Sequence, residues 1–302
     1  MNRLRVWLKA SRLASQSTIA LGLLFGQAMA WHQTGRFDPA IFALVHLYGL
    51  LDQLFIVYAN DLADQEVDAT NATFTLFSGG SRVLVDGELT PEALRRAASW
   101  MAGLAVGVGG VLGVGWGLWW TVPLIVLGLG LLWAYSFPPV ALSYRGGGEL
   151  LQMVGVGLVL PLIGYVAQAG SFEGFPWMLL AVALPLELTC AMCTALPDQP
   201  SDAAAGKRTT AVWMGVEGAQ LAIFAVNLVA LGAFPLVSWL PSGDARSYAF
   251  VAAPLLINLA TLAVRRRARP GTPWMSAYVS LGLLVTMSWL ATAIAALFGA
   301  WG

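Results

Sequence analysis

The sequence predicts an all-α integral membrane protein, a single domain that spans residues 1–302 as a bundle of transmembrane helices. Two observations support this class. Hydrophobic residues make up 58% of the 302 positions and charged residues only 11%, far below the roughly 25% charged residues of a soluble domain. Apolar runs also recur along the whole chain, with lengths suited to crossing ~30 Å of hydrocarbon. The expected surroundings are therefore a lipid bilayer.

The apolar runs predict nine transmembrane helices. They occupy residues 17–31, 40–59, 97–115, 117–137, 150–169, 175–196, 211–239, 248–264 and 274–299. Gly115 and Gly117 predict a break between the third and fourth helices, and Pro235 predicts a bend in the seventh. No convincing small-residue cleavage site precedes Gln33, so we expect the first helix to be retained.

The basic residues predict the orientation of the bundle. If the N-terminus is cytoplasmic, all but two of the 16 lysines and arginines fall on the cytoplasmic side, and only Arg36 and Arg246 fall outside. Cytoplasmic loops of membrane proteins carry such an excess of positive charge. We therefore expect an N-in, C-out topology. No solvated basic domain is present, so a nucleic-acid partner is not expected.

Acidic residues cluster at the predicted cytoplasmic ends of the second and sixth helices. The clusters read Asn60-Asp61-x-x-Asp64-x-x-x-Asp68 and Asp198-x-x-x-Asp202. Carboxylates spaced by four residues lie on one side of a helix, and acids near the bilayer are costly and tend to be functional. Any one of them could also be a solvated loop residue. Oxygen ligands without histidine or cysteine favour Mg²⁺, which bridges carboxylates to phosphate oxygens.

Basic and glycine-rich segments follow these clusters on the same side. Arg82 ends the segment Ser78-Gly79-Gly80-Ser81-Arg82, whose glycines allow close approach of the backbone to an anion. Tyr144 and Arg145 lie in the next cytoplasmic loop, and Lys207 and Arg208 follow Asp202. Mg²⁺ and fixed cations together neutralise a departing diphosphate. In a lipid-embedded pocket, the group to which the departing diphosphate was attached is expected to be an isoprenoid.

Two further features of the sixth helix allow other interpretations. Glu187 lies inside the predicted span, where it is either a hydrogen-bonded residue of the bundle interior or a residue near the substrate; it is also the one residue that favours an ion or proton pathway. Cys190 and Cys193 form a C-x-x-C pair without a second pair. We interpret these cysteines as small packing residues.

The motifs resemble, in order and over nearly the whole chain, those of the UbiA superfamily of membrane prenyltransferases. The matching segments are Asn60 to Asp68, Ser78-Gly79-Gly80-Ser81-Arg82-Val83-Leu84, Tyr135-Ser136-Phe137-Pro138-Pro139, Ser143-Tyr144-Arg145-Gly146-x-Gly148-Glu149-Leu150, and Asp198-x-x-x-Asp202-x-x-x-Gly206-Lys207-Arg208-Thr209. The third to fifth segments are most similar to the branch that prenylates 1,4-dihydroxy-2-naphthoate for menaquinone. This resemblance implies a nine-helix bundle with a central cavity capped on the cytoplasmic side.

The resemblance also implies roles for individual residues. It assigns Asp64, Asp68, Asp198 and Asp202 as catalytic, and it assigns a Mg²⁺-binding set of Asn60, Asp61, Asp64, Asp68, Asp198 and Asp202. It assigns diphosphate binding to Asn60, Arg82, Tyr144, Arg145, Lys207 and Arg208. Aromatic faces such as those of Tyr58, Trp133 or Tyr135 could shield an allylic cation. Ser11-Arg12-Leu13 replaces an Arg-Pro-x-Thr-Leu pattern common in the family, and Ala203 replaces a charged residue; these departures leave the acceptor open.

We therefore expect a Mg²⁺-dependent transferase that moves a polyprenyl group from its diphosphate to an aromatic quinone precursor. Its expected location is the inner cell membrane, as a multi-pass protein whose active site faces the cytoplasm. Two alternatives remain open at this point. One is a membrane terpene cyclase that traps the cation within its substrate, and the other is a carrier or transporter of lipid diphosphates that performs no catalysis.

Overall fold

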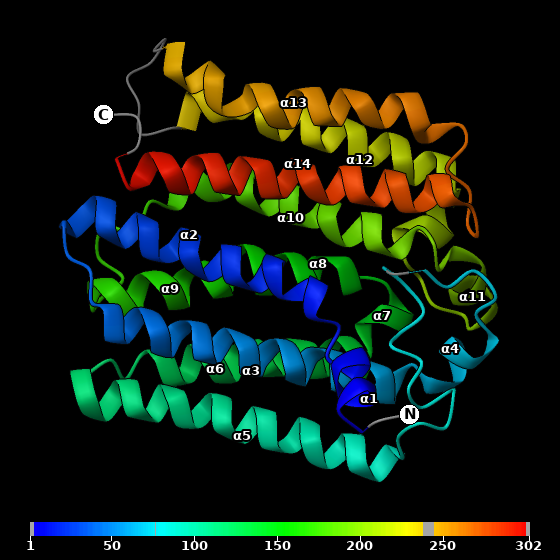
Figure 1. Cartoon of the computed structure of the whole chain (residues 1–302). Coiled ribbons are helices and arrows are strands. Elements are labelled where there is room, and N and C mark those ends of the chain that lie inside the picture. Colours follow the sequence, from blue (N-terminus) through cyan, green and yellow to red (C-terminus); the bar gives the residue numbers. More distant parts are fainter. Residues whose placement is uncertain (1–2, 76, 238–244, 300–302) are drawn as a thin grey trace.

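The computed structural model describes residues 3–75, 77–237 and 245–299, and these residues form an all-helical bundle (Figure 1). The bundle has no strand within those ranges. Six helices are long and apolar enough to cross a membrane: α3 (Pro39–Ala63), α5 (Pro91–Trp116), the segment Gly148–Ala169, the segment Trp177–Ala195, α12 (Thr210–Val237) and α14 (Pro273–Leu297). The predicted all-helical fold class, with several helices suited to crossing a membrane, is thus confirmed.

The remaining apolar runs also coincide with helices, although they do not meet the same criteria for crossing. They are α2 (Gln16–Thr34), α6 (Thr121–Ser136) and α13 (Ala245–Arg265). The side chains of residues 245–249, which include Arg246, lie outside the described part. The number of nine crossings and the N-in, C-out orientation therefore stay predictions.

Sequence signals at the helix ends explain where several helices begin and stop. Asp38, Thr90 and Thr272 are the N-cap residues of α3, α5 and α14. The side chain of each accepts a hydrogen bond from a backbone N–H in the first turn of its helix, and each first turn contains a proline. Such caps satisfy amide groups that a helix start leaves without partners. The predicted break at Gly117 occurs, because this residue ends α5 in the left-handed region with a φ of 73°.

The bend predicted at Pro235 lies elsewhere in the seventh apolar run. Pro235 falls inside α12, which continues to Val237, whereas the backbone leaves helical geometry at Gly215, with φ 70° and ψ 163°. Glycine adopts a positive φ without a steric penalty. Pro235 sits in the last turn of the helix, where the loss of one backbone hydrogen bond has little effect on the rest of the helix.

Close contact between α2 and α9 (Leu160–Ala169) forms the centre of the bundle. A Cβ atom at Gly26 would collide with the carbonyl of Pro161, and one at Gly164 would collide with the carbonyl of Leu23. Small residues allow membrane helices to approach at backbone distance. The α2–α9 contact consequently holds the segment Gly148–Ala169, and with it one wall of the central cavity, against the N-terminal helices.

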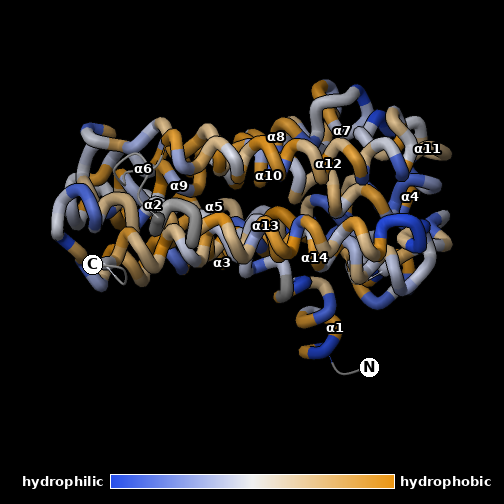
Figure 2. Tube along the Cα trace, turned by 90° about the horizontal axis from the view of Figure 1, so that it is seen from above, coloured by the Kyte–Doolittle hydropathy of each residue, from blue (hydrophilic) through white to orange (hydrophobic). Residues whose placement is uncertain are grey.

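Short helices gather at one end of the bundle. They are α4 (Gln65–Thr70), α7 (Leu142–Arg145) and α11 (Gln199–Ala204) (Figure 1), whereas α1 (Arg3–Ala10) projects from the side of the bundle (Figure 2). Hydrophilic residues are concentrated around α4 and α11 in Figure 2. The loops that the sequence places on the cytoplasmic side therefore meet at a single polar end, although they come from distant parts of the chain.

Candidate active site

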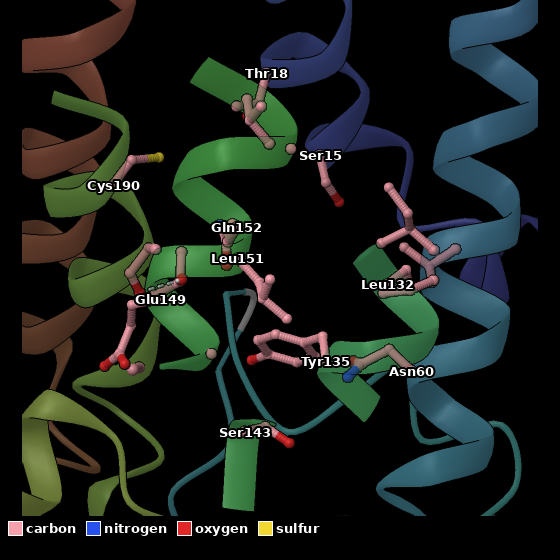
Figure 3. A pocket seen from close by; sticks show the side chains of 18 of the residues that line it. Ser15, Thr18, Asn60, Leu132, Tyr135, Ser143, Glu149, Leu151, Gln152 and Cys190 are labelled. Atoms are coloured by element: carbon pink, nitrogen blue, oxygen red, sulfur yellow. Dashed lines mark hydrogen bonds between the residues drawn. The ribbon is translucent and has the colours of Figure 1, made fainter. Parts of the chain in front are cut away.

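A cavity of about 370 Å³ opens near the polar end and extends between the helices. Its mouth is polar and includes Asn60, Asp64, Asp68, Asp198, Asp202 and Lys207, while its interior includes Ile56, Leu131, Leu132, Val156, Val159 and Leu160. Figure 3 shows side chains of α3, α6 and α8 (Gly148–Val154) around this space, among them Asn60, Tyr135 and Gln152. A volume of this size is typical of small-molecule sites. The cavity suits a ligand with a charged head and an apolar body.

The first acidic cluster forms one side of the mouth. Asp64 links the C-terminal end of α3 to the start of α4, so that the chain turns between the two helices. The Nδ2 atom of Asn60 donates a hydrogen bond of 2.9 Å to Oδ2 of Asp64. Asp68 belongs to α4 and is buried, yet it lines the cavity. The predicted spacing of four residues thus places Asn60, Asp64 and Asp68 on one wall.

The second acidic cluster faces the first because α11 packs against α4. Asp198 is the N-cap residue of α11, and Asp202 lies in its first turn. The side-chain amide of Asn71 donates a 2.6 Å hydrogen bond to Oδ1 of Asp198 and so joins the two clusters. The structure brings both predicted clusters to the same cavity mouth, and it adds Asn71, which the sequence motifs did not indicate.

Lys207 lies between the two clusters. Its Nζ atom is 2.9 Å from Oδ1 of Asp64 and 3.5 Å from Oδ1 of Asp202, and its side chain is only 8% exposed. The ammonium also lies 5.3 Å from the centre of the Tyr144 ring. Burial disfavours the charged ammonium, but the carboxylates of Asp64 and Asp202 outweigh this effect and raise the pKa of Lys207. The lysine is therefore a fixed cation within the mouth.

Negative charge exceeds positive charge around the cavity. Burial, together with the neighbouring Asp64 carboxylate, raises the pKa of Asp68 to about 7. Burial raises the pKa of Asp202 to about 7 as well, although Lys207 opposes the shift. Among the described residues, Arg12 and Lys207 are the only cationic side chains in the lining. The mouth therefore favours the binding of additional positive charge.

Asp61 differs from the other acids in the first cluster. It forms an ion pair with Arg12 and accepts a hydrogen bond from the hydroxyl of Ser81. The backbone N–H of Ser81 donates a further bond of 3.2 Å to its Oδ1 atom. Asp61 is buried and does not line the cavity. These contacts give Asp61 a supporting position, where it holds Arg12 and the glycine-rich turn beside the mouth.

Arg12 is a cavity residue that the sequence analysis did not single out as part of the site. It follows α1 with a positive φ of 40°, and its Nε atom is buried without a hydrogen-bond partner among the described residues. Gly80 has a φ of 66°, and a Cβ atom there would collide with the carboxylate of Asp68 and lie 3.1 Å from an Arg12 guanidinium nitrogen. Glycine is thus required where the turn, Arg12 and Asp68 meet.

The other predicted diphosphate ligands occupy different positions. The Tyr144 hydroxyl lies 3.4 Å from Oδ1 of Asp64, at hydrogen-bond distance. Arg82 donates a 3.0 Å hydrogen bond to the backbone carbonyl of Asp68 and stacks over Phe74, so it braces the turn beneath the mouth. Arg145 and Arg208 have exposed side chains and do not line the cavity. Diphosphate binding by these arginines remains a prediction.

The three aromatic candidates also differ in whether they line the cavity. Tyr135 lines the cavity and lies beside its polar mouth (Figure 3). Tyr58 packs edge-on against Trp7, and Trp133 is 45% exposed; neither is among the lining residues. Tyr135 is therefore the aromatic residue of this group that is positioned to face a cation in the cavity.

The sixth predicted helix contributes several lining residues, Cys190, Ala191, Thr194 and Ala195, and one buried acid. Cys190 lines the cavity, whereas Cys193 packs against Gly282 of α14. Glu187 is buried outside the lining, beside Gly157 of the π-helical segment η2 (Gly155–Val159). Its Oε2 atom has no hydrogen-bond partner among the described residues. Its position leaves both earlier interpretations of Glu187 open.

The carboxylates at the mouth provide the right atoms for Mg²⁺, but they do not form a closed cage. Within the described residues, no three histidine, cysteine or acidic side chains are grouped closely enough to hold one metal ion. Mg²⁺ keeps several waters and binds through one or two carboxylates plus substrate phosphates. The arrangement of the two clusters fits this mode, in which diphosphate completes the ligand set.

Comparisons with known proteins agree with this architecture. Residues 19–284 match the model of the UbiA prenyltransferase family. The chain is 26% identical over 230 residues to the 2-carboxy-1,4-naphthoquinone phytyltransferase of Synechocystis sp., which covers 74% of this chain and 70% of that protein.

Solved structures share the fold at low sequence identity. A UbiA homologue from Aeropyrum pernix K1 in its apo form superimposes with a TM-score of 0.70 at 17% identity, over 92% of this chain and 97% of the homologue. A UbiA homologue from Archaeoglobus fulgidus bound to DMAPP and Mg²⁺ gives a TM-score of 0.66 at 15% identity, over 94% and 98%. The chain belongs to the UbiA prenyltransferase family and is a prenyltransferase.

Proposed function

We propose that this enzyme transfers a polyprenyl group from its diphosphate to an aromatic quinone precursor similar to 1,4-dihydroxy-2-naphthoate, in a Mg²⁺-dependent reaction. The observation that carries the proposal is the pair of aspartate clusters that face each other across the mouth of an apolar cavity. Two relatives support it. One is named as a naphthoquinone phytyltransferase, and the other is a fold neighbour bound to DMAPP and Mg²⁺.

In this proposal the diphosphate lies between the two clusters. Asn60, Asp64 and Asp68 would hold Mg²⁺ on one side, Asp198 and Asp202 would hold it on the other, and Asp61 would support the first group. The bound metal supplies positive charge that stabilises the leaving diphosphate. Lys207 adds a fixed cation between the clusters, and Tyr144 adds a hydroxyl beside Asp64. Arg12 contributes a second fixed cation, while Arg82, Arg145 and Arg208 remain predicted ligands at the rim.

The proposed reaction breaks the bond between the allylic carbon and the diphosphate oxygen, whose electron pair leaves with the diphosphate. The face of Tyr135 shields the allylic cation through a cation–π contact. A ring carbon of the acceptor then forms the new carbon–carbon bond, and loss of a proton or of CO₂ restores aromaticity. Apolar lining residues such as Leu131 and Val156 exclude water, which would otherwise capture the cation.

The membrane arrangement is proposed together with this function. We propose one domain with nine crossings, a cytoplasmic N-terminus, an outward C-terminus and an active site that opens to the cytoplasm from the inner membrane. Support comes from the gathering of the loops after α3, α6, α10 and α13 at the end of the bundle that carries the cavity mouth (Figure 1). Together with the adjoining ends of α5 and α13, these loops contain ten of the 16 basic residues, an excess typical of cytoplasmic loops.

One experiment separates the proposed activity from its rivals. Purified enzyme would be incubated with radiolabelled geranylgeranyl diphosphate and Mg²⁺, with and without 1,4-dihydroxy-2-naphthoate. We expect a labelled prenylated aromatic product that requires both the acceptor and the metal. A labelled cyclic hydrocarbon that forms without acceptor would identify a terpene cyclase instead, and binding without turnover would indicate a carrier.

A further inference from the structure

A group of polar side chains lies deep in the cavity, within the part of α3 that crosses the apolar region. Tyr48, Asp52 and Gln53 all line the cavity, and they are 0%, 4% and 4% exposed. Tyr48 and Asp52 share the face of α3 that also carries Ile56 and Asn60, because residues four apart in a helix lie one above another. This face therefore presents a second polar zone, well inside the mouth.

These polar groups have no partners that explain their burial. The Tyr48 hydroxyl is buried without a hydrogen bond among the described residues. Neither Asp52 nor Gln53 forms a side-chain hydrogen bond or ion pair within that part of the chain, and both lie against the cavity. Gln16, whose amide lies 3.9 Å from a Cβ built on Gly49, has a buried Oε1 atom that also lacks a partner.

An unpaired carboxyl group in a membrane helix is expensive, and such residues mark functional sites. Packing does not require a carboxyl group at position 52, since leucine has a similar size and would avoid the free-energy cost of burying it. By contrast, the buried polar residues Thr189, Asn227 and Asn258 are joined to one another by hydrogen bonds between helices. The difference indicates that Tyr48, Asp52 and Gln53 find their partners on a ligand.

The depth of these three polar side chains in the cavity indicates which substrate they contact. Asn60 and Asp52 are eight residues apart, which corresponds to roughly 12 Å along an α-helix. A diphosphate at the mouth, followed by the allylic carbon and an aromatic ring, would extend toward this depth. A prenyl tail has no polar atoms to offer, so the aromatic acceptor is the substrate whose chemistry matches. A carboxylate accepts hydrogen bonds, and it therefore favours a hydroxyl donor over a second carboxylate.

The opposite wall leaves room beside the tyrosine. Gly128 of α6 faces Tyr48, and a Cβ atom built on this glycine would lie 3.4 Å from the Tyr48 hydroxyl oxygen. Gln152 of α8 is a further polar residue that lines the same cavity (Figure 3). The zone thus offers both donors and acceptors around an otherwise apolar space.

We propose that Tyr48, Asp52 and Gln53 form an acceptor subsite, in which Asp52 accepts a hydrogen bond from a phenolic hydroxyl of the aromatic substrate. This subsite rests on the proposed function, since it specifies how the same cavity recognises its second substrate. It orients the ring so that a carbon atom, and not the bound oxygen, faces the allylic centre.

The test compares acceptors that differ by one hydroxyl donor. Initial rates would be measured for 1,4-naphthalenediol and 4-methoxy-1-naphthol, with wild-type enzyme and with Asp52→Leu. A hydrogen bond to a charged group contributes about 1.5–3 kcal/mol, or ~10–100-fold. We expect the wild type to prefer the diol by about that factor in kcat/KM, and Asp52→Leu to lose most of this preference while the KM for the prenyl diphosphate stays within about twofold.

Two controls separate recognition from damage to the bundle. Gln27→Leu removes another buried polar side chain, one that hydrogen-bonds to His46 outside the cavity lining, and it should keep the preference for the diol. Asp52→Asn retains a carbonyl acceptor and should keep part of the preference, which also covers the case in which the leucine variant does not fold.

The outcomes distinguish the two proposals. If the wild type prenylates no aromatic acceptor, the proposed function fails. If the wild type turns over but Asp52→Leu keeps the same preference, or slows both acceptors equally as loss of a bound water would, the acceptor subsite fails and the proposed function stands.

Discussion

Replacement of Lys207 by alanine should weaken both the fold and the reaction, because this lysine is the fixed cation between the two acidic clusters. Its Nζ atom lies 2.9 Å from Asp64 and 3.5 Å from Asp202. With an effective dielectric constant of about 20, these separations correspond to attractions of about 6 and 5 kcal/mol before desolvation is subtracted. Breaking one partner of a buried ion pair typically costs about 3–5 kcal/mol. We expect a loss of unfolding free energy in that range.

Mg²⁺ should reverse part of the loss in Lys207→Ala. The substitution leaves buried carboxylates without their counter-ion, and a bound divalent cation would replace the missing charge. Thermal unfolding in detergent, with and without Mg²⁺, measures both effects, and Lys207→Arg tests whether charge alone is sufficient. Lys9→Ala is the matched control, since Lys9 pairs with Asp86 and Glu88 at a solvated surface. Such pairs contribute about 0–1 kcal/mol.

The kinetic consequence of Lys207→Ala follows from the same geometry. A fixed cation beside a departing diphosphate stabilises the transition state, and removal of one such group lowers kcat by about 10²–10³. A Lys207→Ala enzyme that retained a normal rate and lost no more stability than Lys9→Ala would contradict this expectation. That outcome would mean that Asp64 and Asp202 do not depend on Lys207 for their burial.

Three further predictions concern the same mouth. Asp64→Ala and Asp198→Ala should each abolish turnover while the protein stays folded, because each removes an oxygen ligand and little packed volume, and Lys207 keeps Asp202 as a partner when Asp64 is replaced. Near-normal rates at saturating Mg²⁺ would show that the metal assignment is wrong. Arg208→Ala should raise the KM for the prenyl diphosphate more than the KM for the acceptor, and Arg208→Lys should also impair the enzyme, since a guanidinium binds phosphate through two hydrogen bonds. Steady-state kinetics with each substrate varied in turn measures both KM values. A defect confined to the KM for the acceptor would contradict the prediction. The stability of the metal-free protein should depend on pH through Asp68 and Asp202, whose pKa values of about 7 in the fold exceed the value of about 4 in an unfolded chain. Stability should therefore fall as the pH rises from about 4 through 7, and Mg²⁺ should raise Tm more at pH 8 than at pH 6. An equal increase in Tm at both pH values would contradict this prediction.

The helices and acidic clusters could be predicted from the sequence because local signals specify them. Apolar runs mark the helices, and proline after Asp38 or Thr90 marks where two of them begin. The spacing of Asp64 and Asp68 fixes their common side. The bend at Gly215 was not predicted, because a glycine within an apolar run has the same pattern whether its φ is negative or positive.

The residues that the sequence did not reveal depend on tertiary contacts. Arg12 is one of several basic residues near the N-terminus, and only the folded chain shows that it reaches the cavity and pairs with Asp61. Asn71 is an ordinary loop residue until α4 meets α11. Asp52 was missed for a different reason. A single acid within an apolar run is visible in the sequence and signals an intramembrane site, but only Glu187 was interpreted in this way from the sequence.

The two acidic clusters should together bind one metal–diphosphate unit. Calorimetric titration of a non-reactive prenyl diphosphate analogue tests it directly, with wild type, Asp64→Asn, Asp198→Asn and the double variant, each with and without Mg²⁺. Residues that act as one unit give strongly non-additive effects. We predict Mg²⁺-dependent binding in the wild type, a severe loss in each single variant, and little further loss in the double variant. Equal binding without Mg²⁺, or independent and additive losses from the two clusters, would show that the clusters do not share one metal–diphosphate unit.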